Sequence, residues 1–260
     1  VKAYVKRNKN DAADAAAICE AVTRPSMRFV AVKSPEQQSL LILHRSRSLL
    51  VRQRTMLVNA IRAHLAEFGI VAARGRMGVE ALQAVIADPD ETRLPALART
   101  CLESLVVALE AVEQEIAQAE RRIHAWHRGS ETSRRLATIP GIGPIIATAL
   151  VATVTDPAVF KSGRELAAWI GLVPRQNSTG GKERMGRISK QGDPYLRWML
   201  VAGAMAVIQQ GRKTDFQKMP WLGDLMEGKT KKVAAVALAN KTARIVWALL
   251  SNDETYRRPA

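Results

Sequence analysis

The sequence predicts a mainly α-helical fold, in which a long antiparallel coiled-coil hairpin precedes a compact helical region that contains a helix-hairpin-helix motif. Two long stretches carry apolar residues at helical spacing and are separated by a short break, as in helices that fold back on each other. After residue 129 the apolar segments shorten and alternate with turns rich in Gly and Pro, which indicates several short helices. With 260 residues, 47% of them hydrophobic, the chain can bury a sizeable core.

Residues 9–22 are expected to form a short, Ala-rich helix, in which Asp11 and Asp14 lie on one face of the first turn. Acids at this position interact favourably with the helix dipole, so one interpretation is helix capping. The other is Mg²⁺ binding, which would need further acids from elsewhere. The first seven residues alternate apolar and basic side chains like a strand, and the chain opens on Val1, so we expect a fragment of a longer protein.

Residues 34–68 are expected to form the first long helix. Ser34, Pro35 and Gln37 provide an N-cap, a first-turn proline and a capping box, and Gly69 ends the helix. Its apolar stripe consists of Leu43, Leu50, Leu57, Ile61 and Leu65. Arginines seven positions apart share faces of the helix, namely Arg45 with Arg52 and Arg47 with Arg54. This basic stripe either meets backbone phosphate or is an ordinary solvated face.

Residues 70–95 form a break with a short helix over residues 79–87, and a second long helix follows. Its apolar residues alternate steps of three and four, as in the seam of a coiled coil: Leu102, Leu105, Leu109, Val112, Ile116, Ala119, Ile123 and Trp126. The two long helices are therefore expected to form a hairpin that closes on itself or pairs with a second copy. We expect a homo-oligomer through this coiled coil.

The C-terminal third is expected to consist of compact helices. Residues 162–165 read as a capping box that opens a helix ended by Gly171, and Asp193 with Pro194 opens another. The last helix is expected over residues 231–250. We expect the five tryptophans, which are scattered among the helices, to be core residues and not platforms for base stacking.

The most informative segment is the turn Ile139-Pro-Gly-Ile-Gly-Pro, which enters an apolar helix. Gly141 and Gly143 would let backbone N–H groups approach a phosphate oxygen at the helix N-terminus, as in a helix-hairpin-helix motif. The alternative is a plain turn between two helices. The small residues Ala147 and Ala149, placed where the helices must cross, favour the motif.

A second candidate site is the Gly-rich, basic loop that begins at residue 175. Ser178 lies at its centre, and the residues expected to face phosphate are Arg175, Gly180, Gly181, Lys182, Arg184, Arg187 and Lys190. Such cations would stabilise the charge that develops when a serine attacks a phosphodiester. The alternative is a serine that only hydrogen-bonds a phosphate or a turn. The four histidines lie on the long helices, which argues against a hydrolase triad.

The composition narrows the class of partner. A net charge of +15 favours a polyanion, and nucleic acid is the default choice. Cys19 and Cys101 are isolated, so the sequence supports neither a disulfide framework nor a structural zinc site, which fits the cytoplasm. The sequence has neither a signal peptide nor an uninterrupted apolar stretch of membrane-spanning length, so we expect no membrane partner.

Taken in order, these motifs resemble those of the DEDD transposases of the insertion-sequence one-ten family, also called bridge-RNA-guided serine recombinases. The resemblance rests on Lys9-Asn-Asp-Ala-Ala-Asp-Ala15, the long helical pair, Ile139-Pro-Gly-Ile-Gly143, Gly171-Leu-Val-Pro-Arg-Gln-Asn-Ser-Thr-Gly-Gly181 and Asp193-Pro-Tyr-Leu-Arg197. It covers essentially the whole chain, and several motifs agree in order and spacing.

The resemblance implies three parts: residues 1–32 as the remnant of an α/β RuvC-like catalytic domain, residues 33–128 as a coiled-coil linker, and residues 129–260 as the C-terminal transposase domain. It implies that Ser178 forms a covalent link to a DNA phosphate and that a structured guide RNA selects the DNA. Asp11 and Asp14 match the last two of the family's four Mg²⁺-binding acids, which shifts the interpretation of this pair from capping to metal binding.

The sequence departs from the family pattern because the segment that should carry the first two acids is missing before Val1. We therefore expect the chain alone to bind nucleic acid but to be weak or inactive in recombination. The competing hypotheses are a non-catalytic protein that uses the same motifs only to clamp DNA or RNA, and a helical scaffold whose coiled coil is the function.

Overall fold

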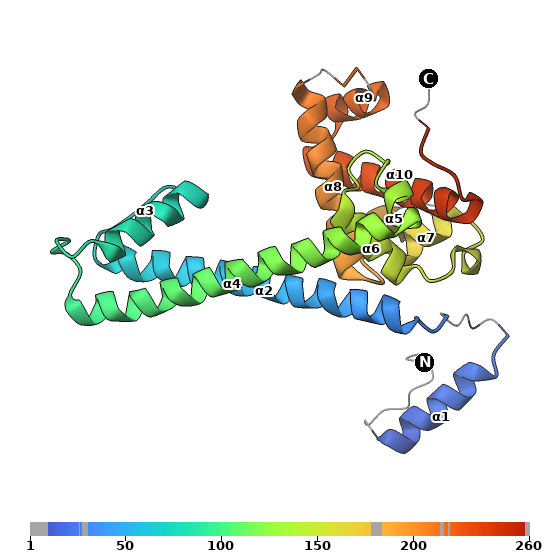
Figure 1. Cartoon of the computed structure of the whole chain (residues 1–260). Coiled ribbons are helices and arrows are strands. Elements are labelled where there is room, and N and C mark those ends of the chain that lie inside the picture. Colours follow the sequence, from blue (N-terminus) through green and yellow to red (C-terminus); the bar gives the residue numbers. More distant parts are fainter. Residues whose placement is uncertain are drawn as a thin grey trace. The chain divides into compact units, whose positions relative to one another are not determined.

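The computed structural model describes residues 10–25, 27, 31–177, 184–213, 216–217 and 219–257. The described residues are mainly helical, and two short strands complete them (Figure 1). The chain divides into two compact units, residues 1–32 and residues 33–260. The expected strand over the first seven residues lies outside the described residues, so an α/β remnant stays a prediction.

The first unit contains helix α1, Asp11–Val22. Asn10 is its N-cap, and the Asn10 side chain accepts a hydrogen bond from the Ala12 N–H at 2.9 Å. Asp11 and Asp14 lie in the first turn, as predicted, but neither is the N-cap residue. Asn10 therefore makes the side-chain cap, while Asp11 and Asp14 keep the first-turn position in which acids interact favourably with the helix dipole.

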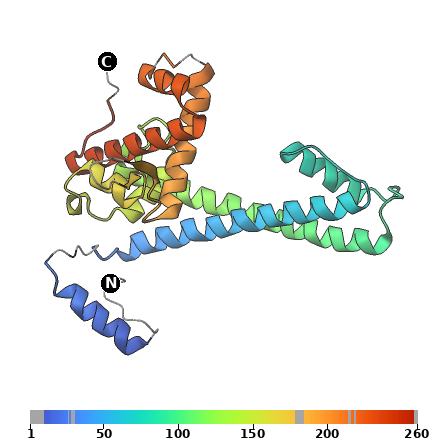
Figure 2. The ribbon, with the colours of Figure 1, turned by 180° about the vertical axis from the view of Figure 1, so that it is seen from behind.

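Two long helices form the antiparallel hairpin of the second unit: α2, Pro35–Glu67, and α4, Ala96–Gly129. They lie side by side in both ribbon views (Figures 1 and 2). The capping box between Ser34 and Gln37 is present, and Gly69, with φ +70°, follows the end of α2. All eight predicted seam residues of α4 are buried or half-buried, which confirms that the hairpin closes on itself.

Helix α3, Arg76–Ala87, packs against the far end of the hairpin. It begins three residues before the predicted start because Gly75, with φ +97°, is its N-cap. Leu82 and Ile86 of α3 join a small core with residues of both long helices, including Ile61, Leu65 and Leu102. This core fixes the end of the hairpin that lies away from the compact region.

The compact region contains α5, Glu131–Leu136, α6, Pro144–Thr153, η2, Pro157–Val159, α7, Gly163–Trp169, α8, Pro194–Lys213, α9, Pro220–Gly228, and α10, Lys231–Asn252. These helices enclose the larger hydrophobic core. The predicted end of α7 and the predicted start of α8 are confirmed. Gly171, with φ +82°, follows α7, and the Asp193 carboxylate accepts from the Tyr195 N–H at 2.7 Å at the start of α8. Helix α10 runs two residues beyond the predicted end.

The predicted capping box at the start of α7 is wrong in one detail. The Ser162 side chain makes no capping hydrogen bond. The Glu165 carboxylate instead accepts from the Lys161 N–H at 2.6 Å, one residue before the cap. Gly163 explains the local geometry, because a Cβ at this position would lie 2.9 Å from the Arg244 backbone of α10, so the chain enters α7 in close contact with that helix.

The basic loop of the sequence is a β-hairpin. Strand β1, Pro174–Gln176, pairs antiparallel with β2, Met185–Ile188, and Pro174 faces Ile188 in the register. The Asn177 N–H donates to the Arg184 carbonyl at 2.9 Å and extends the pairing toward the tip. The sequence pattern did not predict these strands because glycines and charged residues hide the alternation that marks a strand.

Among the described residues, α10 is long and apolar enough to cross a membrane by length and composition alone. A core helix meets the same criteria. Eight residues of α10 are buried, and the helix packs against α7 and α8.

Candidate nucleic-acid interface

The Gly-x-Gly turn connects α5 to α6 as the helix-hairpin-helix prediction requires. The Ile142 N–H donates to the Ile139 carbonyl at 3.0 Å, which closes the turn. Gly143 is the N-cap of α6 and Pro144 its first residue, and no side chain caps this end of the helix. The first backbone N–H groups of α6 therefore keep the donor capacity that a phosphate oxygen would use.

The two glycines of this turn have different roles. Gly141 has φ +86°, and a Cβ there would lie 2.8 Å from the carbonyl oxygen of Gly203 in α8. At Gly203 a Cβ would in turn lie 2.1 Å from the Gly141 carbonyl oxygen. Gly143 has open space where its Cβ would be. Gly141 is thus required for the backbone conformation and for packing, whereas Gly143 is free to meet a ligand.

The role of Gly203 was not predicted from the sequence. A glycine within an apolar helical stretch is a signal of close packing, and Gly203 lies within such a stretch. Ala147 and Ala149 of α6 are fully buried, as expected at a helix crossing.

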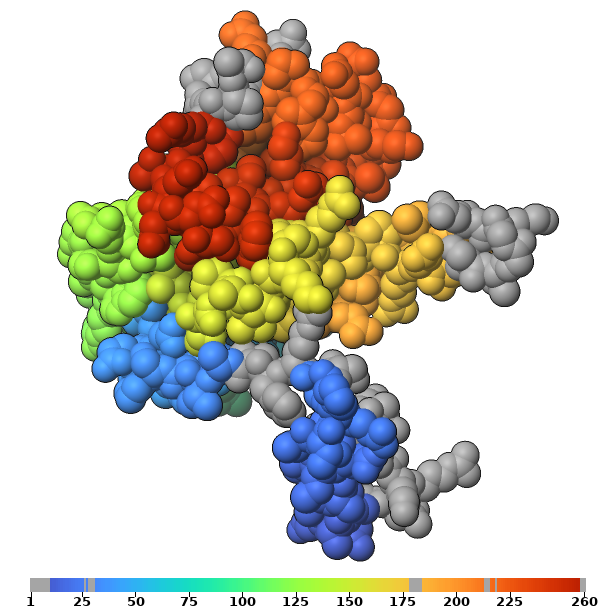
Figure 3. Space-filling view, turned by 90° about the vertical axis from the view of Figure 1, so that its right-hand side faces the viewer, coloured from blue at the N-terminus to red at the C-terminus, as the bar shows by residue number. Residues whose placement is uncertain are grey.

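The β-hairpin carries the cations of the second candidate site. Arg175, Arg184, Arg187 and Lys190 are all exposed. Figure 3 shows the described strands extending from the helical body of the second unit. Ser178, Gly180, Gly181 and Lys182 lie outside the described residues, so their predicted roles are not placed in the structure.

Several contacts anchor the base of this hairpin. The Lys190 N–H donates to the Gly171 carbonyl at 3.2 Å, and the Arg175 guanidinium donates to the Ser189 carbonyl at 3.1 Å. The Arg197 guanidinium donates to two backbone carbonyls, Ile170 and Gln191, each at 2.9 Å. Arg197 therefore connects the end of α7 to the segment that enters α8, and much of its donor capacity is used within the protein.

A buried polar cluster that the sequence did not predict joins the long hairpin to the compact region. His44 of α2 is 1% exposed, its Nδ1 lies 3.0 Å from the Tyr195 hydroxyl of α8, and its Nε2 lies 3.0 Å from the Thr148 hydroxyl of α6. The Thr148 hydroxyl donates to the Pro144 carbonyl at 2.8 Å. His44 Nε2–H therefore donates to Thr148 Oγ1, and Nδ1 accepts from the Tyr195 hydroxyl.

The electrostatics of this cluster favour a neutral imidazole. Burial, together with the nearby Arg47 guanidinium, lowers the pKa of His44 to about 4. Burial also raises the pKa of the Tyr195 hydroxyl, although Arg47 opposes that shift. A neutral His44 is the form that accepts from Tyr195 and donates to Thr148 at the same time.

The arginines of the predicted basic stripe of α2 differ in their surroundings: some are exposed, and one pairs with α4. Arg45 and Arg52 are exposed, and Arg54 is half-buried. Arg47 donates from Nε to the Glu120 carboxylate of α4 at 2.9 Å, and the two side chains form an ion pair between the long helices. At this position the charge holds the hairpin together, so the stripe is not a continuous solvated face.

The carboxylates of Asp11 and Asp14 are suitable ligands for Mg²⁺, but two residues are too few to complete a site. Both are in the first turn of α1, Asp11 exposed and Asp14 half-buried, and their carboxylate oxygens are the hard ligands that Mg²⁺ prefers. Within the described part of the chain, no group of three or more potential metal ligands comes together. These two acids therefore provide part of a ligand set.

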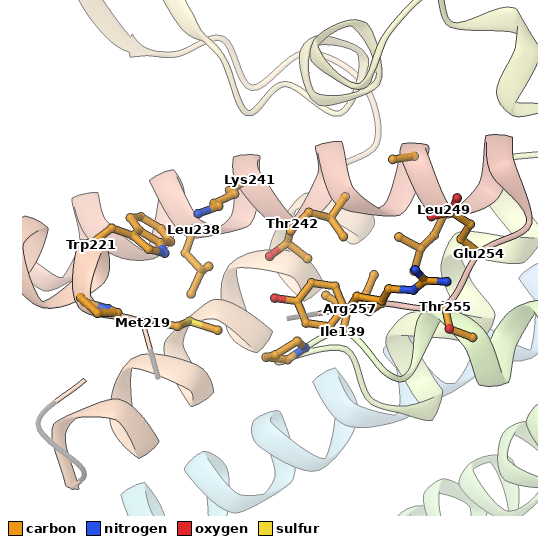
Figure 4. Close-up of a pocket in the computed structure, with 15 residues that line it drawn as sticks. Ile139, Met219, Trp221, Leu238, Lys241, Thr242, Leu249, Glu254, Thr255 and Arg257 are labelled. Atoms are coloured by element: carbon orange, nitrogen blue, oxygen red, sulfur yellow. The ribbon is translucent and has the colours of Figure 1, made fainter. Parts of the chain in front are cut away.

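A pocket of about 600 Å³ in the compact region lies between Ile139 and Pro140, the start of α9, helix α10 and residues 254–257 (Figure 4). Trp221 is at one end of the pocket, and the Lys241 ammonium lies 4.1 Å from the centre of its ring. A cation of the protein itself thus covers this indole.

Three of the five tryptophans, Trp169, Trp221 and Trp247, pack against the larger core as predicted, and Trp126 is half-buried. Trp247 donates its indole N–H to the carbonyls of Pro157 and Phe160, at 3.1 and 3.2 Å, as a core residue does. Trp198 of α8 is 58% exposed. Its position one turn after the start of a capped helix, directly after the basic segment, is the sequence signal that could have singled it out.

Comparisons with known proteins connect these features to a family. The family model for the transposase IS116/IS110/IS902 family matches residues 133–218, and a DEDD transposase model matches residues 1–70. The chain is 50% identical over 259 residues to a probable family 20 transposase of Pseudomonas aeruginosa, covering 99% of this chain and 76% of that protein.

Two further relatives are similar over the same span. A putative transposase of Sinorhizobium fredii is 48% identical over 259 residues, covering 99% of this chain and 66% of the relative. The transposase for insertion sequence element IS1111A of Coxiella burnetii is 42% identical over 258 residues, covering 99% of this chain and 71% of the relative. With this identity over nearly its whole length, the chain belongs to the IS116/IS110/IS902 family of transposases.

Proposed function

We propose that this transposase cleaves and rejoins DNA through Ser178, with a structured RNA that selects the DNA by base pairing. The observation that carries the proposal is the β-hairpin, because both strands that lead to Ser178 bear exposed cations and its base is anchored to α7 and α8. Membership of a transposase family already implies action on DNA. The serine, the metal and the RNA are the parts that the proposal adds.

In the proposed step, Ser178 Oγ attacks the phosphorus of a phosphodiester. A P–O bond to a sugar oxygen breaks while a P–O bond to serine forms, and the proton lost by the hydroxyl is balanced by the one that the departing sugar oxygen gains. Arg184 adjoins the tip of the hairpin, and its guanidinium would stabilise the additional negative charge of the transition state. Arg175, whose guanidinium contacts the base of the hairpin, would position the DNA backbone. Attack by a sugar hydroxyl of another strand reverses the step and rejoins the DNA.

Asp11 and Asp14 are the residues that would hold Mg²⁺, together with further acids of the family's set. When bound, Mg²⁺ polarises a phosphoryl oxygen and lowers the pKa of a bound water. Because two assigned acids form only part of a ligand set, we propose that residues 1–260 alone bind nucleic acid and recombine weakly.

We also propose that the protein acts as a homo-oligomer through the α2–α4 hairpin. Between α3 at one end and α6 at the other, the hairpin consists of its two long helices, and apolar side chains remain exposed there, including Met56 at 70% and Leu49 at 48%. Exposed apolar surface on a long helix pair is typical of a coiled coil that pairs with another copy.

The test is the covalent protein–DNA adduct. Wild-type protein, Ser178→Ala and the matched control Ser189→Ala, on the same hairpin, are incubated with labelled DNA, guide RNA and Mg²⁺, with and without chelator. Because residues 1–260 are expected to react slowly, long incubations are used, alongside any longer form that the gene encodes. We expect adducts with the wild type and Ser189→Ala, and none with Ser178→Ala or with chelator.

DNA binding is measured on the same proteins by electrophoretic mobility. Retained binding by Ser178→Ala with loss of the adduct supports catalysis through this serine. If Ser178→Ala forms adducts as the wild type does, Ser178 is not the nucleophile, and the protein is better described as a clamp that uses the same basic hairpin without this chemistry.

A further inference from the structure

Trp198 is unusual because it is an aromatic side chain that the protein leaves open. It is 58% exposed, and within the described part of the chain it is the one aromatic residue among the exposed large hydrophobic side chains. The other four tryptophans are half-buried. Trp247 is held by two hydrogen bonds, and Trp221 is covered by the Lys241 ammonium. Trp198 therefore differs from the core tryptophans in having aromatic surface available to a partner.

The ring of Trp198 is supported from one side. It stacks on Tyr195, one turn earlier in α8, with ring centroids 6.3 Å apart and an interplanar angle of 29°. Tyr195 is itself fixed, because its hydroxyl lies 3.0 Å from the buried His44 Nδ1 and its N–H donates to Asp193. A ring held in this way loses little side-chain freedom when a ligand stacks on it.

The surroundings of Trp198 are cationic. Between residues 184 and 198 there are four basic residues, Arg184, Arg187, Lys190 and Arg197, against one acid, Asp193. The Asp193 carboxylate is engaged at the start of α8, where it accepts from the N–H groups of Tyr195 and Leu196 at 2.7 and 3.3 Å. From the N-cap Asp193 to Trp198 the helix rises only about 7 Å. The exposed ring is thus close to the base of the basic hairpin.

An exposed aromatic ring beside a row of cations is the arrangement that binds single-stranded nucleic acid. The cations contact phosphates, and the ring stacks on a base that is not paired. A protein partner fits less well, because a surface with this charge excess attracts phosphate in preference to an ordinary protein surface.

We propose that Trp198, stacked on Tyr195, is a platform for an unpaired nucleobase of the strand whose backbone the β-hairpin contacts. The inference rests on the proposed function, since it takes the basic hairpin as the place where nucleic acid binds. It assigns Trp198 a binding role and leaves the chemistry to the tip of the hairpin. Both single-stranded DNA and single-stranded RNA present this ligand, and the experiment below distinguishes them.

The experiment measures the affinity of the full chain for three labelled probes by fluorescence polarisation. The probes are oligo-thymidylate of about 12 nucleotides, the matching oligo-uridylate and a blunt DNA duplex of the same length. For Trp198→Ala we expect roughly tenfold weaker binding of a single-stranded probe, with an unchanged salt slope and little change for the duplex. Trp198→Phe, which keeps an aromatic ring, should lose no more than about threefold.

Two control variants accompany this pair. Arg187→Ala should weaken the binding of every probe and reduce the salt slope by about one, as expected for a phosphate contact. Trp169→Phe, a half-buried residue packed on Phe160, should bind as the wild type does. In the wild type and Trp169→Phe, binding of a single strand should quench tryptophan emission, and Trp198→Phe should lose most of this quenching.

Two outcomes overturn the inference. One is wild-type affinity of Trp198→Ala for both single strands, and a change in sedimentation alongside it would assign the ring to a protein contact. The other is an equal loss of affinity for the duplex, because the ring would then not read an unpaired base. If the wild type binds none of the probes, the proposed nucleic-acid function fails first, and the two failures are thereby distinguished.

Discussion

The Gly141–Gly143 turn and the β1–β2 hairpin were both expected to bind phosphate, but the protein builds them in opposite ways. The turn is packed against α8, its neighbouring residues Ile139 and Ile142 are buried, and it offers only backbone donors. The hairpin is exposed and offers four described cationic side chains. The difference teaches that glycine can serve two purposes: Gly141 allows close packing in the first motif, whereas the glycines of the second motif stand in a segment rich in basic residues.

The two motifs would bind phosphate by different means: the turn through rigidly held backbone donors, and the hairpin through charged side chains. At the turn, a ligand would meet donors whose positions are fixed by the core, so binding would depend on shape. At the hairpin, long side chains can adapt to a phosphate backbone, so binding would depend on charge and salt. Substitutions where Gly141 packs against α8 are therefore expected to act mainly on stability, and substitutions of the hairpin cations mainly on affinity.

The largest effect is expected where the turn meets α8. In Gly203→Ala the new Cβ would lie 2.1 Å from the Gly141 carbonyl oxygen, so the turn must move away from the helix. We expect the free energy of unfolding to fall by more than about 3 kcal/mol, at the upper end of the cost of overpacking a core. Chemical denaturation followed by circular dichroism measures the change.

Gly129→Ala is the matched control, because Gly129 also lies in a helix and a Cβ there meets open space. Its stability should stay the same or rise by about 0.5 kcal/mol. Equal stability of Gly203→Ala and the wild type would show that the glycine contact does not hold the turn in place.

The second effect concerns His44, which fixes α6 and α8 behind the turn. Because burial lowers its pKa to about 4, the unfolded chain binds a proton near pH 6.5 while the folded protein does not. The stabilisation is therefore fully present above pH 6.5 and is lost as the pH falls from 6.5 to 4, by up to about 3 kcal/mol. Stability measured as a function of pH should show this decline in the wild type.

His44→Gln should be less stable than the wild type at pH 7.5, and the difference should narrow as the pH falls toward 4. The matched control is His64→Gln, since His64 is an exposed histidine of the same helix, and it should keep the wild-type pH profile. A constant difference between His44→Gln and the wild type over this range would mean that the titration of His44 does not contribute.

Much of the fold could be predicted because it depends on local signals. Several of these signals depend only on residues close together in the sequence, and all are present in the structure: the Ser34 capping box, Gly69, the α4 seam, and Asp193 with Pro194. The β-hairpin was missed because its strands are three and four residues long and lack apolar alternation.

The candidate site was harder to predict, since its parts meet only in the folded protein. His44 and Tyr195 are 151 positions apart in sequence, and Gly141 of the turn meets Gly203 of α8. No spacing rule connects such pairs. The roles of Ser178, Asp11 and Asp14 came from resemblance to a family, which local periodicity could not have supplied, and they stay predictions.

The smallest effect on stability, and the sharpest division between the two regions, is expected at Gly143. Its φ of −89° suits alanine and its Cβ would meet open space, so Gly143→Ala should change the free energy of unfolding by less than about 1 kcal/mol. If the start of α6 binds phosphate, the added methyl group lies where the oxygen would approach, and affinity for duplex DNA should fall several-fold with little change in the salt slope. Arg187→Ala should instead lower affinity and reduce that slope. Wild-type affinity of Gly143→Ala for duplex DNA would make the turn a purely structural element and leave phosphate binding to the hairpin alone.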